Sequence, residues 1–444
     1  MKKYLSLIII LLMMVVTTSC FERTSEFKDS VSEKYVVKMA KTDLEKRLNN
    51  NEEYDAFLTK VQDFSYKLSE YVYEDYEEDN NFVISPYSVF MSLAMTVEST
   101  NGTSREEILN ALNMSYEELY MYVKNLYSDH KKEYKGENML GNKFVQGLED
   151  INNSIWVEEG LTLKEDTMNS LADNFYVSTY KVPFVNNIDK ANQAFRSYIK
   201  NATRGLIDKD FNLSNETIFM LVNAYYLKDI WDENIKELSF TKETYNFINF
   251  DESTTNTKLL MGDYIDGKPY ETEMFKTATT RTNHGYRIKF ILPQDGYTVE
   301  DIYTSEVLKE VSENDSYLAV DDVNMEINHT KCYFPEYDAE YDGDIQNALS
   351  EKFGIKSIFN IDTADFTSLV DGPAFIQQVL HQTKLTVNKY GIEGAAVTVQ
   401  NVCGSAGPGP YTNVYHTFVV DKAFAFIITD YLGTVVFSGV TKSI

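Results

Sequence analysis

The sequence predicts a single domain of the α+β class, with helices in its first third and long β-strands after them. Apolar residues at helical spacing begin at Tyr54, and two further helix starts follow at Ser85-Pro86 and at Ser104. The later part switches to strand character and closes on a pair of strands joined by a tight turn. No shift in composition and no internal repeat divides residues 54–444.

Local signals justify the elements in order. The first helix carries an apolar face from Phe57 onward and ends in a run of acids, which a solvated helix end explains. Ser85 and Pro86 mark the start of the second helix, and Ser104 is the expected N-cap of the third, with Glu107 as its capping-box partner. The strands are expected in the segments SIWVEEGLTL, TIFMLVNAYYLKDIW, YRIKFILP, TFVVDKAFAFIITD and GTVVFSGVTKS.

Composition excludes several classes of protein. The 444 residues include only 20 Gly and 8 Pro, which is too few for a disordered or linker-rich chain. The net charge of −27 would repel a phosphate backbone and an anionic lipid surface, so nucleic acid is excluded as a partner. Three Cys cannot form a disulfide framework, and five scattered His lack the spacing of metal ligands. We therefore expect no metal, no cofactor and a stability that rests on a packed core.

The N-terminus has the layout of an export signal. Residues 1–19 begin with two lysines and continue with an apolar stretch that is too short to span a bilayer as a permanent helix. The small residues before Cys20 resemble the bacterial lipoprotein signal, in which the cysteine is lipidated and becomes the mature N-terminus. Thr17 departs from that pattern, which prefers a larger aliphatic residue, so plain secretion is the alternative. Residues 20–50 are expected to form a polar tether before a globular domain at 51–444.

One segment stands apart from ordinary loops. GIEGAAVTVQNVCGSAGPGP, at 391–410, lies between strands that are about 30 residues apart, which is long for a connection. Alternate positions from Ile392 on carry no charge, as in a strand that could enter a sheet, yet the final AGPGP cannot continue a ladder. A plain Gly/Ala linker is the other interpretation of this composition.

Collinear matches along the whole of 54–444 resemble the serpins, the serine protease inhibitor family. They are the segments NFVISPYSVFMSLAM, NGTSREEILNAL, NSIWVEEGLTL, MLVNAYYLKDIW, DFTSLVDGPAFIQQVLHQTKLTVNKYGIEGAAVT and FVVDKAFAFIITDYLGTVVFSGVTK. The resemblance implies the serpin fold, in which helices pack on a large central mixed β-sheet with smaller sheets beside it. It also implies an exposed reactive-centre loop, here at about 389–416, and a chain that is not an enzyme.

In serpins the loop is bait: a protease attacks it, forms an acyl-ester and is trapped as the cut loop inserts into the main sheet. The hinge that must enter the sheet matches Gly391, Ile392, Glu393, Gly394, Ala395, Ala396, Val397 and Thr398. Ile392 replaces the usual Thr or Ser, and we expect it to slow insertion or strain the packing without blocking it. Lys389 and Tyr390 replace the common acidic pair, and Gln400 would bury an amide that needs a partner.

Further positions match the regions of the family that let the main sheet open. Ser85, Ser88, Asn223 and His381 correspond to the buried shutter network through which the central strands part, and Trp231 corresponds to the tryptophan at the top of the sheet. The resemblance gives them a role in opening and no catalytic role.

The residues of the predicted reactive-centre loop limit which proteases could be targets. No Lys or Arg occurs between Gly391 and Asp421, which excludes a trypsin-like target. Counting forward from the hinge glycine gives the scissile bond Ser405-Ala406, which suits an elastase- or subtilisin-like protease. Counting back from the closing strands gives Tyr411-Thr412, which suits a chymotrypsin-like one. The counts disagree because the loop is about seven residues longer than usual, and the hinge-side count is preferred.

The expected partner is thus a serine protease, with papain-like cysteine proteases as a second class. Glu117 and Glu118 lie where heparin-dependent serpins gather basic residues, so heparin is not expected as a partner. We expect a monomer that is exported and either anchored at the cell surface or secreted. The alternative is a non-inhibitory surface binding protein on the serpin scaffold.

Overall fold

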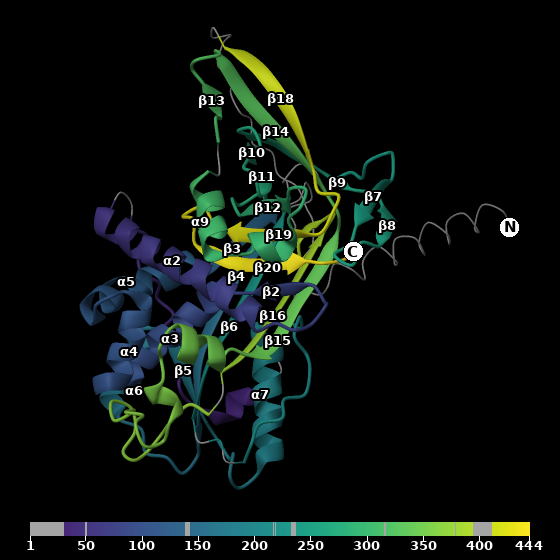
Figure 1. Cartoon of the computed structure of the whole chain (residues 1–444). Coiled ribbons are helices and arrows are strands. Elements are labelled where there is room, and N and C mark those ends of the chain that lie inside the picture. Colours follow the sequence, from purple (N-terminus) through teal and green to yellow (C-terminus); the bar gives the residue numbers. More distant parts are fainter. Residues whose placement is uncertain are drawn as a thin grey trace, which may run out of the picture.

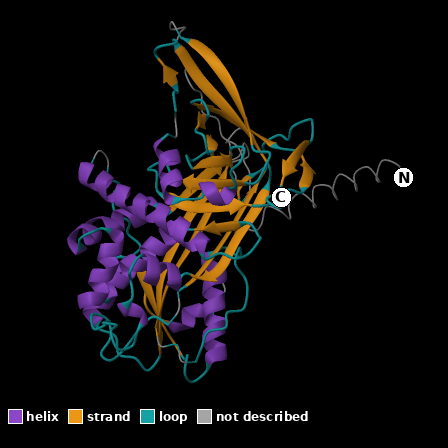
Figure 2. Cartoon of the chain, in the orientation of Figure 1, coloured by secondary structure: helices purple, strands orange, loops and turns teal. Residues whose placement is uncertain are grey.

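Helices gather in the lower part of the molecule and strands dominate its upper part in the computed structural model (Figures 1 and 2). The structure describes residues 31–48, 51–137, 143–215, 217, 219–231, 237–314, 317–377, 379–393 and 411–444. Its helices are α2 (Glu52–Glu74), α3 (Pro86–Ser99), α4 (Gly102–Leu112), α5 (Tyr116–Asp129), α6 (Glu165–Asn174), α7 (Ile188–Ala202), α8 (Val299–Ile302) and α9 (Ser305–Glu313). The α+β class that the sequence predicts is the one observed.

Several helix starts, those of α2 and α3 among them, follow local capping, whereas α4 begins without a side-chain cap. Asn51 accepts a hydrogen bond from the Tyr54 amide at 3.0 Å, and Ser85 caps α3 ahead of Pro86. The predicted cap at Ser104 is wrong, because α4 begins at Gly102 and Ser104 lies inside it, fully buried. Its hydroxyl instead accepts the amide of Asp365 at 3.0 Å, a partner far along the chain.

The main sheet is mixed and runs through the centre of the molecule. Its strand order is β1-β5-β4-β6-β17-β16-β15, and β3 pairs with β4. The bounds are β1 (Val36–Lys38), β3 (Lys132–Glu137), β4 (Lys143–Glu158), β5 (Val177–Val182), β6 (Phe219–Ile230), β15 (Tyr337–Asp344), β16 (Leu380–Asn388) and β17 (Gly391–Ile392). Strands β4 and β5 are parallel, whereas β6 is antiparallel to β4.

Smaller sheets complete the upper part. One has the order β10-β11-β12-β19-β20-β2, a second joins β9, β13, β14 and β18, and a third pairs β7 with β8. Their bounds are β2 (Phe82–Ile84), β7 (Tyr245–Ile248), β8 (Thr254–Thr257), β9 (Leu260–Asp266), β10 (Tyr270–Glu271), β11 (Phe275–Arg281), β12 (Arg287–Pro293), β13 (Val320–Asp321), β14 (Glu326–Phe334), β18 (Thr412–Val419), β19 (Phe424–Thr429) and β20 (Val435–Thr441). The closing strands β19 and β20 are buried along their whole length, as their continuous apolar sequences predict.

Buried apolar side chains join these layers. One cluster lies between the helices and the sheets and includes Phe57 and Phe90. A second holds the β11–β12–β19–β20 region against the upper main sheet, and Ile392 belongs to it. A third packs α7 on the main sheet, where the Trp156 ring stacks on Tyr180 with centroids 4.3 Å apart. The main sheet is thus packed on both faces.

Residues 31–48 differ from the free tether that the sequence analysis predicts for 20–50. They lie along the body, where β1 adds a strand to the edge of the main sheet at β5. The Lys41 amide donates to the Ala172 carbonyl at 3.0 Å, and the Glu45 amide donates to Ser128 at 3.0 Å. Among the residues that the structure describes, no helix combines the length and the apolar character needed to cross a membrane.

Gly439 on β20 offers a test of how tightly the second sheet is packed. A Cβ at this position would lie 2.2 Å from the Phe82 carbonyl oxygen and 2.7 Å from the Phe426 ring. We predict that Gly439→Ala lowers the free energy of unfolding by about 1–3 kcal/mol, because backbone and ring must both move. Gly160→Ala is the matched control, since no atom lies within 4 Å of its Cβ position. Equal urea midpoints for the two variants would contradict the prediction.

Candidate functional site

A two-residue strand at the start of the predicted hinge lies inside the main sheet. Gly391 pairs with Ile230 of β6 and Ile392 pairs with Asp229, while both also pair with residues of β16 on the other edge. In the described part of the chain, β6 and β16 form no ladder with each other, and β17 separates them. The first two residues of the predicted hinge therefore form a short strand between β6 and β16.

Only glycine fits at position 391. Its φ of 151° lies in a region that other residues rarely adopt, and a Cβ there would lie 2.0 Å from the Asp229 carbonyl oxygen. The preceding turn is held by Lys389, whose amide donates to Glu336 at 2.8 Å and whose ammonium group lies 2.7 Å from Glu237. The basic residue that departs from the acidic pair of the family thus has acidic partners in this chain.

The next two hinge residues are already withdrawn from solvent. Ile392 is completely buried and packs in the cluster that also contains Val387 and Trp231. The strain expected from this large side chain is not visible here, because the cluster accommodates it. Burial raises the pKa of Glu393 to about 7, although Tyr226 and Lys228 beside it favour the charged form. No residue that the structure describes forms a hydrogen bond with its Oε2 atom.

Below β17 the sheet encloses an unfilled slot. A cavity of about 380 Å³ lies between β6 and β16, over the start of α3. Its walls include Ser88, Val89 and Leu93 from α3, Leu221 and Asn223 from β6, and His381 from β16. The edges of β6 and β16 that face this slot pair with no strand of the described residues below β17. At its upper end the same gap between β6 and β16 is occupied by the single strand β17.

The four predicted shutter residues lie together at this slot. The Ser88 hydroxyl donates to Asn223 at 2.5 Å, and the Ser85 amide donates to His381 Nε2 at 3.1 Å. The Thr383 hydroxyl lies 2.7 Å from the same nitrogen. Burial lowers the pKa of His381 to about 4, so the imidazole stays neutral and accepts these hydrogen bonds.

The upper end of the slot is closed by a second set of polar contacts. The Trp231 indole donates to the Asn388 carbonyl at 2.6 Å and thereby ties the end of β6 to the end of β16. Asp229, fully buried, lies 2.5 Å from His284 Nδ1 and accepts a hydrogen bond from Thr282 at 2.5 Å. Because the Asp229 backbone pairs with Ile392, these contacts fix the strand edge that holds the hinge.

Residues 59–443 match the family model described as serpin (serine protease inhibitor). The chain belongs to the serpin family. Human neuroserpin is 25% identical over 391 residues, which cover 82% of this chain and 86% of that relative. The predicted family is thus confirmed, and serpins are for the most part inhibitors and not catalysts.

Solved serpin structures confirm the predicted fold. The native state of tengpin, a thermophilic serpin, aligns with a TM-score of 0.71 at 22% identity over 91% of this chain and 97% of that one. Thyroxine-binding globulin in complex with thyroxine aligns with a TM-score of 0.66 at 17% identity over 87% of this chain and 99% of that one. Likeness at this level of identity extends to the fold, and the second relative shows that one serpin scaffold binds a small ligand.

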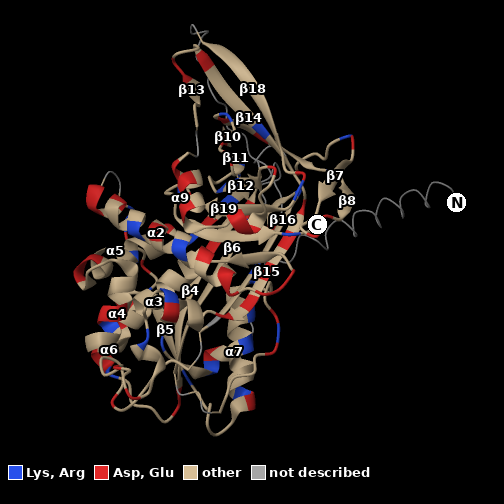
Figure 3. Ribbon diagram, in the orientation of Figure 1, with Lys and Arg blue, Asp and Glu red and all other residues tan. Residues whose placement is uncertain are grey.

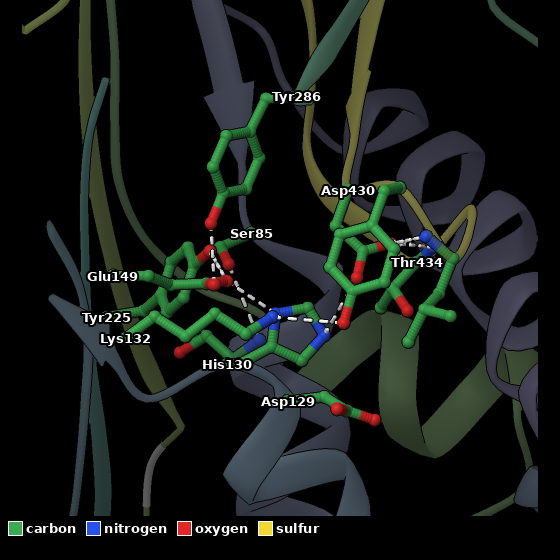
Figure 4. A network of polar contacts seen from close by, with 12 residues as sticks. Ser85, Asp129, His130, Lys132, Glu149, Tyr225, Tyr286, Asp430 and Thr434 are labelled. Carbon is green, nitrogen blue, oxygen red and sulfur yellow. Dashed lines mark hydrogen bonds and ion pairs between the residues drawn. The ribbon is translucent and has the colours of Figure 1, made fainter. Parts of the chain in front are cut away.

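The sequence analysis does not identify several buried polar residues that lie beside the slot. A buried network beside the slot, shown in Figure 4, centres on Glu149 of β4, which lies 2.5 Å from His130 Nδ1 and accepts hydrogen bonds from Tyr225 and Tyr286 at 2.7 and 2.5 Å. Burial opposes the charge of Glu149, but the charge of His130 and its hydrogen bond prevail, so the pKa of Glu149 is lowered. For His130, burial lowers the pKa, but the charge of Glu149 and the hydrogen bond between the two side chains outweigh it, so the pKa of His130 is raised. Asp430 lies 3.9 Å from the other nitrogen of His130.

Glu149 and Tyr225 lie on β4 and β6, whereas His130, Tyr286 and Asp430 lie in segments directly beside α5, β12 and β19, and no motif links the five in the sequence. Isolated acids and histidines carry no spacing signal when their partners come from other strands. Asn153 is the exception, because its amide oxygen accepts a hydrogen bond from Asn223 at 2.6 Å and it stands within the polar run NNS of a buried strand. Such a run inside a predicted strand could have indicated a buried polar contact.

Part of the predicted site falls outside the described residues: Cys20, the hinge positions Gly394, Ala395, Ala396, Val397 and Thr398, and the bond Ser405-Ala406. The alternative bond is described. Thr412 begins β18, which pairs in parallel with β14, and its amide donates to the Met325 carbonyl at 2.8 Å. The Tyr411 hydroxyl donates to Asp322 at 2.7 Å. Strand β18 therefore takes up the last residues of the segment 389–416 that is predicted as the reactive loop, from Thr412 on.

The buried neutral His381 predicts a defined pH dependence of stability. Its pKa is about 4 in the folded serpin and about 6.5 when unfolded, so the unfolded state binds the proton more readily. The contribution of neutral His381 to the free energy of unfolding is complete above pH 6.5. On the order of 3 kcal/mol of it is lost as the pH falls toward 4. We predict that His381→Gln flattens the loss of stability between pH 6.5 and 4.5. Urea midpoints that fall equally steeply in both proteins would contradict this.

Proposed function

We propose that this serpin is a suicide-type inhibitor of serine endopeptidases with elastase-, subtilisin- or chymotrypsin-like specificity. The protease would be held as an acyl-ester after the cleaved loop enters the main sheet. One observation carries the proposal: the first hinge residues form β17 between β6 and β16, directly above a slot with no strand in it among the described residues. The slot supports the proposal because a strand can enter the sheet only where β6 and β16 are not paired with each other.

The register of β17 supports insertion of the residues that follow it. Continued antiparallel pairing from Ile392 would bring Thr398 opposite Asn223 on β6 and opposite His381 on β16 at the same time. Both are shutter residues, and each carries a polar group at the slot. The same register would reach Phe219, the first residue of β6, at position 402. The inserted strand would thus fill the sheet to the end of β6.

Backbone hydrogen bonds supply the driving force in this mechanism. Two strand edges that now lack a ladder would both gain one when a strand enters between them. Small uncharged residues at alternate positions of the hinge would face the core without a clash. Insertion of about 14 residues at about 3.3 Å each would carry a tethered protease roughly 45 Å along the sheet.

The length of the slot also bears on the scissile bond. A strand that reaches the end of β6 at residue 402 leaves the bond Ser405-Ala406 just beyond the sheet, which supports this bond over the alternative. Cleavage at Tyr411-Thr412 would require the protease to bind a segment whose second residue is paired with β14. The absence of Lys and Arg from Gly391 to Asp421 supports the exclusion of trypsin-like targets.

Partners other than a protease are not part of the proposal. Glu117 and Glu118 stand in the first turn of α5, where a polyanion such as heparin would meet like charge. Papain-like cysteine proteases remain a second target class, because they too form an acyl intermediate with the bait. We propose that the serpin acts as a monomer, since the mechanism needs one loop and one sheet.

The proposal predicts an SDS-resistant adduct of the full chain with at least one elastase-, subtilisin- or chymotrypsin-type protease. Ile392→Arg should reduce the adduct yield at least about tenfold and convert the chain to a cleaved substrate. The physical reason is that an arginine must replace a completely buried isoleucine, and an unpaired buried charge is strongly unfavourable. Gel electrophoresis measures both products, and mass spectrometry of the released peptide would identify Ala406 or Thr412 as its first residue.

The matched control is Ile361→Arg, because Ile361 is 44% exposed and lies outside the hinge. It should form the adduct at the normal yield. If every protease cuts the loop and leaves active, and the cut chain melts no higher than the intact one, the non-inhibitory binding protein is the better description. An unchanged yield for Ile392→Arg would contradict the strand register proposed above.

We also propose that the protein is exported and anchored at the cell surface as a lipoprotein of the bacterial type, with secretion as the alternative. Support comes from the basic and apolar residues 1–19 and from the small residues that precede Cys20. Acyl chains, and no basic patch, would supply the attachment, because the net charge is −27.

This anchor predicts fatty-acid labelling that depends on one cysteine. When the gene is expressed in a bacterium fed radiolabelled palmitate, the wild-type chain should carry the label and sediment with membranes. Cys20→Ser should abolish the label, because the thiol that receives the lipid is gone. Cys403→Ser is the control and should keep it. A labelled Cys20→Ser protein, or an unlabelled wild type, would refute lipidation.

A further inference from the structure

A narrow ribbon rises from the body beside the end of the reactive loop. Strand β14 pairs with β18 over Glu326–Tyr333 and with β13 near its upper end, and β9 flanks only its lower part (Figure 1). The turn between β13 and β14 forms the summit. We call the side chains Val320, Val323 and Met325 at this summit the ribbon tip.

The ribbon tip exposes apolar side chains to an unusual degree. Val323 is 92% exposed, Val320 is 53% exposed and Met325 is 39% exposed. None of the three belongs to a hydrophobic cluster of the described structure. Val320 pairs with Ile327 on β14. His329 lies two residues after Ile327, on the same face of β14, and it pairs with Tyr415, which is 61% exposed. The apolar surface therefore continues down one face of the ribbon. Grouped apolar exposure of this kind marks an interaction surface.

The turn that carries Val323 is held in a fixed shape. The Asp321 carboxylate accepts the amides of Val323 and Asn324 at 3.1 and 3.0 Å and the side-chain amide of Asn324 at 2.9 Å. Met325 completes the turn with a positive φ of 56°. A contact surface that is rigid before binding loses little conformational entropy when a partner docks.

The ribbon tip is tied to the residue at which the loop ends. The Tyr411 hydroxyl donates to Asp322 at 2.7 Å, and the Thr412 amide donates to the Met325 carbonyl at 2.8 Å. Residues 406–410 separate the favoured scissile bond from Tyr411. A segment of this length spans at most about 20 Å in any conformation. A protease domain of about 230 residues has a radius of gyration near 17 Å, so one bound at that bond must come close to the ribbon tip.

We propose that the ribbon tip is an exosite that contacts the target protease outside its active site. The inference rests on the proposed inhibitory function and identifies the protease surface that this serpin selects: an apolar patch with basic residues around it. The basic rim follows from the charges at the summit, where Asp321, Asp322 and Glu326 lie between and beside the three apolar residues in the sequence. Figure 3 shows acidic positions at this end of the ribbon. A second contact would help this serpin to select its target protease, because no charged residue lies beside the favoured scissile bond Ser405-Ala406.

The test is the double variant V320S/V323S in the full chain. Both side chains are exposed, so the fold should be unaffected, and an unchanged melting midpoint verifies this. With the protease of the panel that attacks the loop fastest, we expect kcat/KM for loop cleavage to fall about tenfold, equivalent to about 1.4 kcal/mol. The fraction of cleaved chains that end as adduct should not change, because insertion follows docking. V185S, at a valine that is 55% exposed outside the ribbon, is the matched control and should react at the wild-type rate.

The outcomes separate this inference from the proposed function. A wild-type rate for V320S/V323S overturns the exosite, and so does an equal loss in V185S, which would indicate a general effect of the surface. If the wild-type chain is cut without forming an adduct, the inhibitory function fails. A tenfold slower cleavage of V320S/V323S in that same experiment would still support docking at the ribbon tip.

Discussion

The backbone pairing of Gly391 and Ile392 with β6 and β16 is the constraint on which the rest of this structure depends. It holds the two central strands one strand-width apart at their upper ends, and the sheet below consequently has a slot. Glycine at 391 makes the close approach to Asp229 possible, and burial of Ile392 in an apolar cluster stabilises it. Gly391 and Ile392 thus form the upper end of a strand between β6 and β16, and among the described residues no further strand fills the gap below it.

The two sides of the slot are anchored differently. On the β6 side, Glu149 and His130 connect β4 and β6 to the second sheet through the phenols of Tyr225 and Tyr286. On the β16 side, His381 contacts the start of α3 through a single amide and stays neutral because it is buried. A charged network resists displacement more than one neutral hydrogen bond does. The two strands that border the slot thus differ in their polar contacts: β6 joins a buried charged network through Tyr225, and β16 carries a neutral imidazole.

The ribbon holds the chain directly after the undescribed part of the predicted loop. Strand β18 pairs with β14 from Thr412 onward, and the Tyr411 hydroxyl donates to Asp322 beside β14. The two described ends of the predicted loop are therefore paired with different sheets, the main sheet at Gly391 and the β14–β18 sheet at Thr412.

The sequence by itself determined the fold class, through local patterns, and the family, through collinear matches along the whole domain. The hinge and shutter residues follow from that family resemblance and stay predictions. A capped helix start at Ser85, continuous apolar strands at the end of the chain, and a run of small residues after Gly391 can all be read without tertiary contacts. Local signals also misled. Ser104 has the pattern of an N-cap, but its hydroxyl is engaged by Asp365 from another part of the chain, and residues 31–48 have a polar composition but pair with the sheet edge.

Only the tertiary structure decided how far the hinge has entered the sheet, which acids and histidines are paired, and where the loop ends. Entry depends on whether β6 and β16 leave room for a strand, and that is a property of packing against α3. The partners of Glu149, Asp229 and Lys389 come from strands far apart in sequence, so no spacing could indicate them. Strand register is set by contacts across the sheet, and for this reason the sequence alone could not show that Gly391 and Ile392 pair with both β6 and β16.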